Sequence, residues 1–480
     1  MFDFGPLPPL MFLSMVGFML YGFPVAFSLG AAGLFFGLVG IATDHFAPGF
    51  LAAMPHRVLG ILSNDLLLAI PFFTFMGAIL ERCGLAEDLL EGLGRLFGRV
   101  PGGLAYAVIV VGAVLGAITG TVAASVITMG VISLPIMLRT GYSERLATGV
   151  IAASGTITQV IPPSLVLVVL ADQLGRPVGD MYLGALGPSV AQTLIFLAFI
   201  FVMSVLRPQS MPPLPADERG ALDLRLVAQI LLGILPSIAL IFLVLGTIFM
   251  GLATPTEAGA MGVVGAMALA AINRSLTWPL VSQAMATTAQ ITAMVVFILI
   301  GSSIFTLVFQ GMDGGRWIEH LLAGLPGGQI GFLIFVNLFI FVLAFFLDFF
   351  EIAFIVIPLL VPAAENLGID LVWFGVLICI NLQTSFIHPP FGFALFYLRS
   401  IAPKSLRTSQ IYLGAIPWLG LQLLLVAIVI VWPGLVTGML DRGPAVDPST
   451  VRIELPGIGG LGGGPQPGGL GVPGGLGGAA

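Results

Sequence analysis

The 480-residue sequence carries very little charge. Only 8% of its residues are Asp, Glu, Lys or Arg, whereas an ordinary soluble domain has about 25%. Hydrophobic residues make up 58% of the chain, so it cannot cover a water-facing surface with polar side chains. This composition excludes a soluble enzyme, a nucleic-acid-binding protein and a disordered scaffold. It predicts an all-α, polytopic membrane protein in the lipid bilayer.

The sequence also lacks basic clusters, cysteine pairs and catalytic motifs. Its 17 Lys and Arg residues are scattered singly, which excludes a nucleic-acid partner. Cys83 and Cys379 lie far apart and form neither a disulfide framework nor a CxxC metal motif. An intramembrane enzyme is the rival class, but HExxH, DDxxD and GxSxG are absent, so we expect no catalytic residue. Because the first basic residue is Arg57, we expect the first apolar segment to remain as a span.

Charge-free intervals predict ten membrane spans. Each spanning helix needs about 20 apolar residues, and nine intervals have a suitable length, the first of them long enough for two spans. Two further intervals, 100–138 and 326–364, are about twice as long and are interrupted near their centres. Each could form two full spans or one re-entrant helical hairpin, and the central interruptions favour hairpins.

Flanking charges give the orientation of these intervals. Arg99 and Arg139 flank the first long interval, so both of its ends are expected in the cytoplasm. Glu365 and Asp370 follow the second one, whose ends are expected outside. The complete assignment places both termini outside the cell.

An internal repeat divides the chain into two halves. Five spans and one hairpin in each half would make the second half enter the membrane upside down, which is the inverted repeat of secondary transporters. The predicted parts are a first repeat 1–206, a cytoplasmic linker 207–225, a second repeat 226–440 and a Gly/Pro-rich disordered tail 441–480. The motifs that recur are 101–103 at 326–328, 161–163 at 388–390, and 182–185 at 412–415.

Four interrupted stretches can carry chemistry inside the bilayer: 116–125, 154–158, 346–351 and 381–385. Pro162-Pro163 and Pro389-Pro390 follow two of them, and proline frees an upstream carbonyl because it has no N–H. Hydroxyl and carbonyl oxygens are hard ligands for a cation such as sodium, and the helix starts that follow can attract an anion. The alternative is helix packing by small residues, but the pairing of a hairpin tip with a Pro-Pro break in both halves favours a binding role.

Three titratable residues have open roles. Asp348 lies in an apolar segment and could be an ion ligand, a proton carrier or a structural partner. Glu257 could couple ions, but Thr254-Pro255-Thr256-Glu257 is more typical of a capped helix start. His388 could titrate or could form hydrogen bonds beside the proline break.

At these motifs the sequence resembles the large membrane subunit of tripartite ATP-independent periplasmic (TRAP) transporters, the DctM-like family. The resemblance covers about residues 8–437 in order. The matching motifs are LAIPFF at 68–73, GAITGT at 116–121, AASGTI at 152–157, IPPS at 161–164, TPTEA at 254–258, GID at 368–370, WFGVL at 373–377 and PPFG at 389–392.

The resemblance implies an elevator-type, sodium-coupled importer of organic acids in the bacterial inner membrane. A periplasmic solute-binding protein would deliver a small organic anion such as a C4-dicarboxylate, and a small four-helix (Q-type) membrane subunit would complete the permease. An autonomous ion-coupled organic-anion carrier that needs no binding protein is the alternative.

The resemblance also implies the positions of the sites. Sodium should bind where each hairpin meets a broken helix, and the substrate carboxylate should lie between the two sodium sites. His388 stands where such proteins usually have Thr, so a proton remains an alternative coupling ion. The implied cation ligands are Gly116, Thr119, Gly120, Ser154, Thr156, Asp348, Asn381 and Thr384, and the implied substrate contacts are Thr121, Ser125, Pro162, Thr384, Ser385 and Pro389.

Overall fold

The computed structural model describes residues 5–119, 121–215, 224–323, 326–345 and 347–440, with the backbone alone at 85, 86, 118, 119, 224–232 and 323. Every regular element in these residues is a helix, so the all-α prediction is confirmed. Seven of these helices are long and apolar enough to cross a membrane, or eight if one bent pair counts as a span. The predicted tail 441–480 lies outside the described residues.

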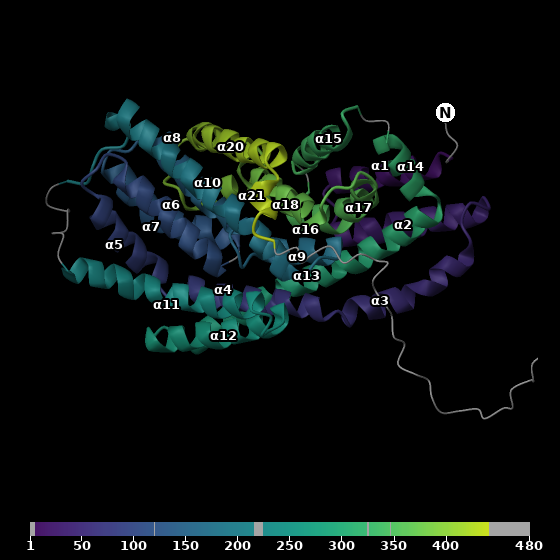
Figure 1. Ribbon diagram of the computed structural model, residues 1–480, viewed down its shortest axis with the longest axis horizontal. Helices are drawn as coiled ribbons and strands as arrows, with labels where there is room; N and C mark the ends of the chain where they lie inside the picture. The colour runs from purple at the N-terminus through teal and green to yellow at the C-terminus, as the bar shows by residue number, and fades with distance from the viewer. Residues whose placement is uncertain (1–4, 120, 216–223, 324–325, 346, 441–480) are drawn as a thin grey trace, which may run out of the picture. The chain divides into compact units, whose positions relative to one another are not determined.

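The described residues of the first half form ten α-helices and four short 3-10 turns. Figure 1 labels these α-helices. They are α1 (Leu7–Leu20), α2 (Val25–Ala42), η1 (Pro48–Ala53), α3 (Met54–Leu62), η2 (Asp65–Leu68), α4 (Ala69–Glu81), α5 (Leu85–Phe97), α6 (Gly103–Thr119), α7 (Val122–Arg139), α8 (Glu144–Thr156), η3 (Ile157–Gln159), α9 (Leu165–Leu174), α10 (Val178–Leu206) and η4 (Pro208–Ser210).

The second half follows a similar order, but one 34-residue helix replaces the bent pair α3–α4, three shorter elements replace α7, and a short helix is added at the end. Its elements are α11 (Leu224–Phe249), α12 (Pro255–Ile272), α13 (Trp278–Gly311), α14 (Gly314–Ala323), α15 (Gly328–Leu343), α16 (Phe349–Glu351), the π-helical turn η5 (Ile352–Val356), α17 (Ile357–Asn366), α18 (Leu371–Ile387), α19 (Phe393–Ile401), α20 (Thr408–Val431) and α21 (Gly434–Thr437).

Local chemistry sets several of the helix boundaries. Asn64 caps η2 by accepting a hydrogen bond from the Leu66 N–H at 3.0 Å. The Thr254 hydroxyl accepts from the Glu257 N–H, and the Glu257 carboxylate accepts from the Thr254 N–H, which is a capping box at the start of α12. The predicted capping role of Glu257 is therefore confirmed.

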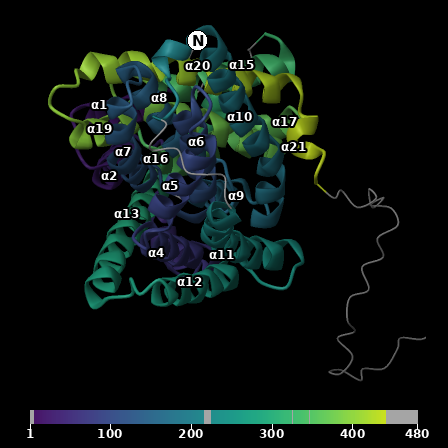
Figure 2. The same ribbon diagram turned by 90° about the vertical axis from the view of Figure 1, so that its left-hand side faces the viewer.

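Helix contacts between the halves occur in reciprocal pairs. By their order along each half, α2 corresponds to α12, α4 to α13, α8 to α18 and α10 to α20. The contact of α2 with α13 has its counterpart in that of α12 with α4, and the contact of α8 with α20 has its counterpart in that of α18 with α10. The last long helix of each half thus packs on the broken helix of the other half. Figure 2 shows α4 beside α12, which belongs to the second half.

The two long intervals 100–138 and 326–364 have different internal structures. In the first, α6 and α7 pack on each other across a short connection. In the second, α15 is followed by the one-turn α16, the π-helical turn η5 and α17. Ser302 of α13 donates a hydrogen bond to the Phe354 carbonyl at 2.6 Å, which satisfies one backbone group of the irregular turn.

Candidate functional site

The first broken helix is formed by α8, η3 and α9. Because Pro162 and Pro163 have no N–H, the carbonyls of Thr158 and Gln159 lose their usual helical partners. The Gln159 carbonyl instead accepts from the Ser164 hydroxyl and, at 3.3 Å, from the Cys379 thiol. Ser164 also caps α9 by accepting from the Val166 N–H at 3.2 Å.

Hydroxyl groups in both broken helices donate their proton to a carbonyl three residues earlier. Ser154 donates to Ile151, Thr156 to Ala153 and Thr158 to Gly155 at 2.8–3.0 Å. Thr384 donates to Asn381 at 2.6 Å and Ser385 to Leu382 at 2.5 Å. All five residues are at least 97% buried. Their hydroxyl oxygens therefore keep lone pairs that can accept a hydrogen bond or bind a cation.

Glycines bring the first hairpin onto the first broken helix. A Cβ added at Gly112 would lie 2.7 Å from the Cβ of Ser154, and one at Gly116 would lie 2.9 Å from the Cα of Thr158. From the other arm, Val126 of α7 packs against Gly155, where an added Cβ would lie 3.1 Å from the Val126 nitrogen. The arms of this hairpin thus contact the backbone of the stretch 154–158 directly.

In the second half, a side-chain amide stands where the first half has the contact between Gly112 and Ser154. Asn337 is equivalent to Gly112, since 337 − 112 equals 326 − 101. The Asn381 side chain donates from Nδ2 to the Asn337 carbonyl at 2.8 Å, and both side chains are buried. A side-chain hydrogen bond therefore joins α15 to α18 where the first half has glycine contact.

Asp348 and Glu351 form a capping box at the start of α16. Asp348 Oδ1 accepts from the Glu351 N–H at 3.0 Å, and Glu351 Oε2 accepts from the Asp348 N–H at 2.9 Å. Of the three roles left open by the sequence, this geometry favours the structural partner for Asp348.

His388 ends α18 and is 99% buried. Its ring stacks on Phe345 with centroids 3.9 Å apart and meets the edge of Phe341 at 5.6 Å. Neither ring nitrogen has a hydrogen-bond partner among the described residues. Aromatic contacts rather than hydrogen bonds therefore hold this side chain.

The structure brings the two broken helices together. α18 packs on η3 and α9, and the Cys379–Gln159 contact joins them at their centres. Pro162 and Ser125 are buried, whereas Thr121 and Pro389 are partly exposed. Of the other predicted ligands, Thr119 ends α6 with only its backbone described, and Gly120 lies outside the described residues.

Two buried contacts made by glutamine side chains could not be found by sequence reasoning. Gln192 and Gln383 exchange amide hydrogen bonds at 2.6 and 3.1 Å, and Gln422 Nε2 donates to the Thr156 hydroxyl at 2.8 Å. Only the equivalence of the two glutamines is visible in the repeat: Gln192 and Gln422 each lie ten residues after the first residue of the Tyr-Leu-Gly-Ala motif.

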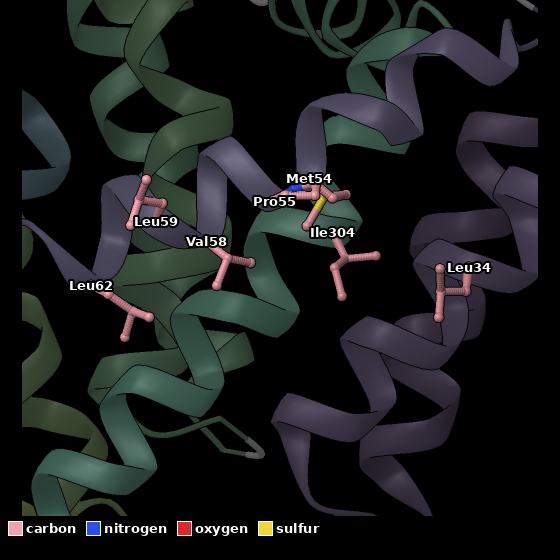
Figure 3. Close-up of a pocket in the computed structure, with 7 residues that line it drawn as sticks. All are labelled: Leu34, Met54, Pro55, Val58, Leu59, Leu62 and Ile304. Carbon is pink, nitrogen blue, oxygen red and sulfur yellow. The ribbon is translucent and has the colours of Figure 1, made fainter.

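An apolar groove of about 590 Å³ lies elsewhere, between α2, α3 and α13. Figure 3 shows side chains of α3 and α13, with Leu34 of α2 across from them. It has no polar side chain in its lining and includes none of the predicted site residues. Its lining is Leu34, Met54, Pro55, Val58, Leu59, Leu62 and Ile304.

Comparison with known proteins gives a match along nearly the whole chain. Residues 12–435 match the family model described as the tripartite ATP-independent periplasmic transporter, DctM component. The C4-dicarboxylate TRAP transporter large permease protein DctM of Vibrio cholerae is 28% identical, over 91% of this chain and 98% of the relative. The sialic acid TRAP transporter large permease protein SiaM of Vibrio cholerae is 26% identical, over 87% and 95%.

The fold also resembles a solved structure. The Alcanivorax borkumensis YdaH transporter superposes with a TM-score of 0.59 at 15% sequence identity, over 89% of this chain and 98% of that one. Together with the apolar helices, these matches identify a multi-pass integral membrane protein and not an enzyme.

Proposed function

We propose that this chain, which belongs to the DctM component family of TRAP transporters, imports an organic acid together with sodium. The observation that carries the proposal is the meeting of two hydroxyl-rich broken helices at the centre of an apolar protein. The first of them is packed directly on the hairpin of its own half. Irregular backbone at membrane depth is tolerated only where protein or a water-filled cavity surrounds it, which supports a binding site there.

Sodium is the coupling ion that suits these groups. Ser154 and Thr156 offer hydroxyl oxygens beside α6, and Asn381 and Thr384 offer an amide and a hydroxyl oxygen in α18. Hard oxygen ligands without a carboxylate cluster suit a monovalent cation, since Ca²⁺ sites usually include Asp or Glu. No cluster of three or more His, Cys, Asp and Glu occurs among the described residues.

The substrate carboxylate would lie between the two cation sites. Pro162 and Pro389 mark the breaks, and α9 and α19 begin three and four residues after them, where a helix start presents N–H groups and a positive dipole end. Thr384 and Ser385 would line the second-half side, and Thr121 and Ser125 the hairpin side. Two relatives are named for C4-dicarboxylate and sialic acid, which both carry carboxylates.

The transport cycle would be an elevator motion of inverted repeats in the inner membrane. The reciprocal contacts between α2, α13, α4 and α12, and between α8, α20, α18 and α10, support a two-fold relation between the halves. The family supports two partners, a small membrane subunit and a periplasmic binding protein.

Uptake into proteoliposomes tests this proposal. The chain and its small subunit would be reconstituted, with the binding protein and a radiolabelled organic acid outside. We expect uptake to fall to background when the sodium gradient or the binding protein is left out, and to persist without a proton gradient. Equal uptake without any cation gradient would contradict the proposal, and sodium-driven uptake that persists without the binding protein would identify an autonomous carrier.

Two substitutions of Asp348 distinguish a capping role of this side chain from a role that depends on its charge. Asp348→Asn keeps an oxygen that can accept the Glu351 N–H, so we expect sodium-driven uptake close to wild type. Asp348→Ala loses the cap, which costs about 1 kcal/mol, and should lower both thermal stability and uptake. If Asp348 instead carries a proton or binds the ion through its charge, the Asn variant will lose as much uptake as the Ala variant.

A further inference from the structure

The last long helix of each half contributes a glutamine that contacts the broken helix of the other half. Gln192 of α10 contacts Gln383 of α18, and Gln422 of α20 contacts Thr156 of α8. These contacts are related by the repeat, since 422 − 192 equals 412 − 182, and 383 − 156 equals 390 − 163. All four side chains are at least 99% buried.

The hydrogen bonds fix which end of the Gln422 amide points to Thr156. The single hydroxyl proton of Thr156 is donated to the Ala153 carbonyl at 3.0 Å, so the hydroxyl can only accept from Gln422. The Gln422 NH₂ must therefore face Thr156, and Oε1 must point away from it. Oε1 has no hydrogen-bond partner among the described residues, although Gln422 is fully buried.

The equivalent glutamine in the other half does not have a free oxygen. Gln192 Oε1 accepts from Gln383 Nε2 at 3.1 Å, and Gln383 Oε1 accepts from Gln192 Nε2 at 2.6 Å. A threonine at position 156 cannot provide the first of these bonds, because its only hydroxyl proton is already donated to the Ala153 carbonyl. The unpaired oxygen is therefore specific to the contact between α20 and α8, and burying such an acceptor costs roughly 1–3 kcal/mol unless something satisfies it.

We propose that Gln422 Oε1 is a ligand of the cation bound at the first broken helix, so that the second half completes the cation site of the first. The free atoms of Thr156 and Gln422 at this point are both acceptors, which attract a cation and repel an anion. An amide oxygen and hydroxyl oxygens are hard ligands that suit sodium. This inference rests on the proposed sodium coupling and adds a residue from α20 to it.

A water molecule is the competing explanation. Trp418 lies one turn before Gln422 on α20, and its Nε1–H also lacks a hydrogen-bond partner among the described residues. A water that bridged this donor to Gln422 Oε1 would satisfy both groups without any cation. The two explanations differ in their dependence on sodium.

Sodium binding by the purified chain with its small subunit tests the proposal. Thermal stability would be measured against sodium chloride, with choline chloride keeping the ionic strength constant, and radioactive ²²Na⁺ binding would be measured directly. We expect Gln422→Met to raise the sodium concentration for half-maximal binding about ten-fold or more. Gln422→Glu keeps an oxygen and should bind sodium at least as tightly as wild type. If the side chain served only as a hydrogen-bond donor to Thr156, both variants would lose that function.

Two controls complete the test. Gln192→Met breaks the equivalent buried pair and should lower stability without changing the sodium concentration for half-maximal binding. Trp418→Phe removes the donor and should also leave it unchanged. Wild-type sodium affinity in a folded Gln422→Met protein, or an equal loss in Trp418→Phe, would overturn the inference. A wild-type protein that binds no sodium would instead overturn the proposed coupling, and this inference with it.

Discussion

Gly149→Ala is expected to prevent most of the protein molecules from folding stably. A Cβ at Gly149 would lie 2.2 Å from the Gly414 carbonyl oxygen and 2.6 Å from the Trp418 indole nitrogen. The first contact is with backbone, so no side-chain rotation relieves it and α8 must move away from α20. Such overpacking costs about 3 kcal/mol or more. It also separates Thr156 from Gln422, since these residues lie on the same two helices.

Gly420, a glycine of the partner helix α20, provides the matched control. Nothing lies within 4 Å of a Cβ added at Gly420, so Gly420→Ala should leave the protein unchanged. Size-exclusion chromatography of detergent extracts and thermal unfolding would compare the two variants. We expect Gly149→Ala to yield little monodisperse protein, with a midpoint about 6 °C or more below wild type in any that remains. Equal midpoints for both variants would show that α8 and α20 do not pack as closely as described.

Features set by local chemistry could be predicted from the sequence. Proline has no N–H wherever it occurs, so Pro162-Pro163 and Pro389-Pro390 mark the ends of α8–η3 and α18 without knowledge of the fold. The capping of α12 by Thr254 and Glu257 depends on four consecutive residues and was predicted for the same reason. Charge-free length likewise indicated where the apolar helices lie.

Features set by tertiary packing could not be predicted. The Gln192–Gln383 and Gln422–Thr156 contacts join residues 191 and 266 positions apart, and only the crossing of α10 with α18 and of α20 with α8 creates them. Asp348 was identified as a carboxylate in an apolar segment, but its mutual capping with Glu351 depends on a helix start that the surrounding apolar residues did not reveal. The short helices α3, α5 and α14 were missed, because their charged residues resemble those of connecting loops.

Asn381→Leu is expected to raise the sodium concentration for half-maximal uptake about ten-fold or more while the protein stays folded. Leucine has a similar volume but lacks the amide, so packing is largely kept whereas the oxygen proposed as a cation ligand is lost. The hydrogen bond from Nδ2 to the Asn337 carbonyl is lost as well, which loosens α15 from α18. A ten-fold change in the sodium requirement corresponds to about 1.4 kcal/mol of binding free energy.

Ser302→Ala distinguishes cation binding from packing. The Ser302 hydroxyl also joins two elements of the second half through one buried hydrogen bond, to the Phe354 carbonyl at 2.6 Å, but it lies outside the proposed site. We expect both variants to unfold at a lower temperature than wild type, and only Asn381→Leu to require more sodium. If the sodium requirement of both variants stays at the wild-type value, the amide of Asn381 serves helix packing alone. The second cation site would then have to be built from Thr384 and backbone carbonyls.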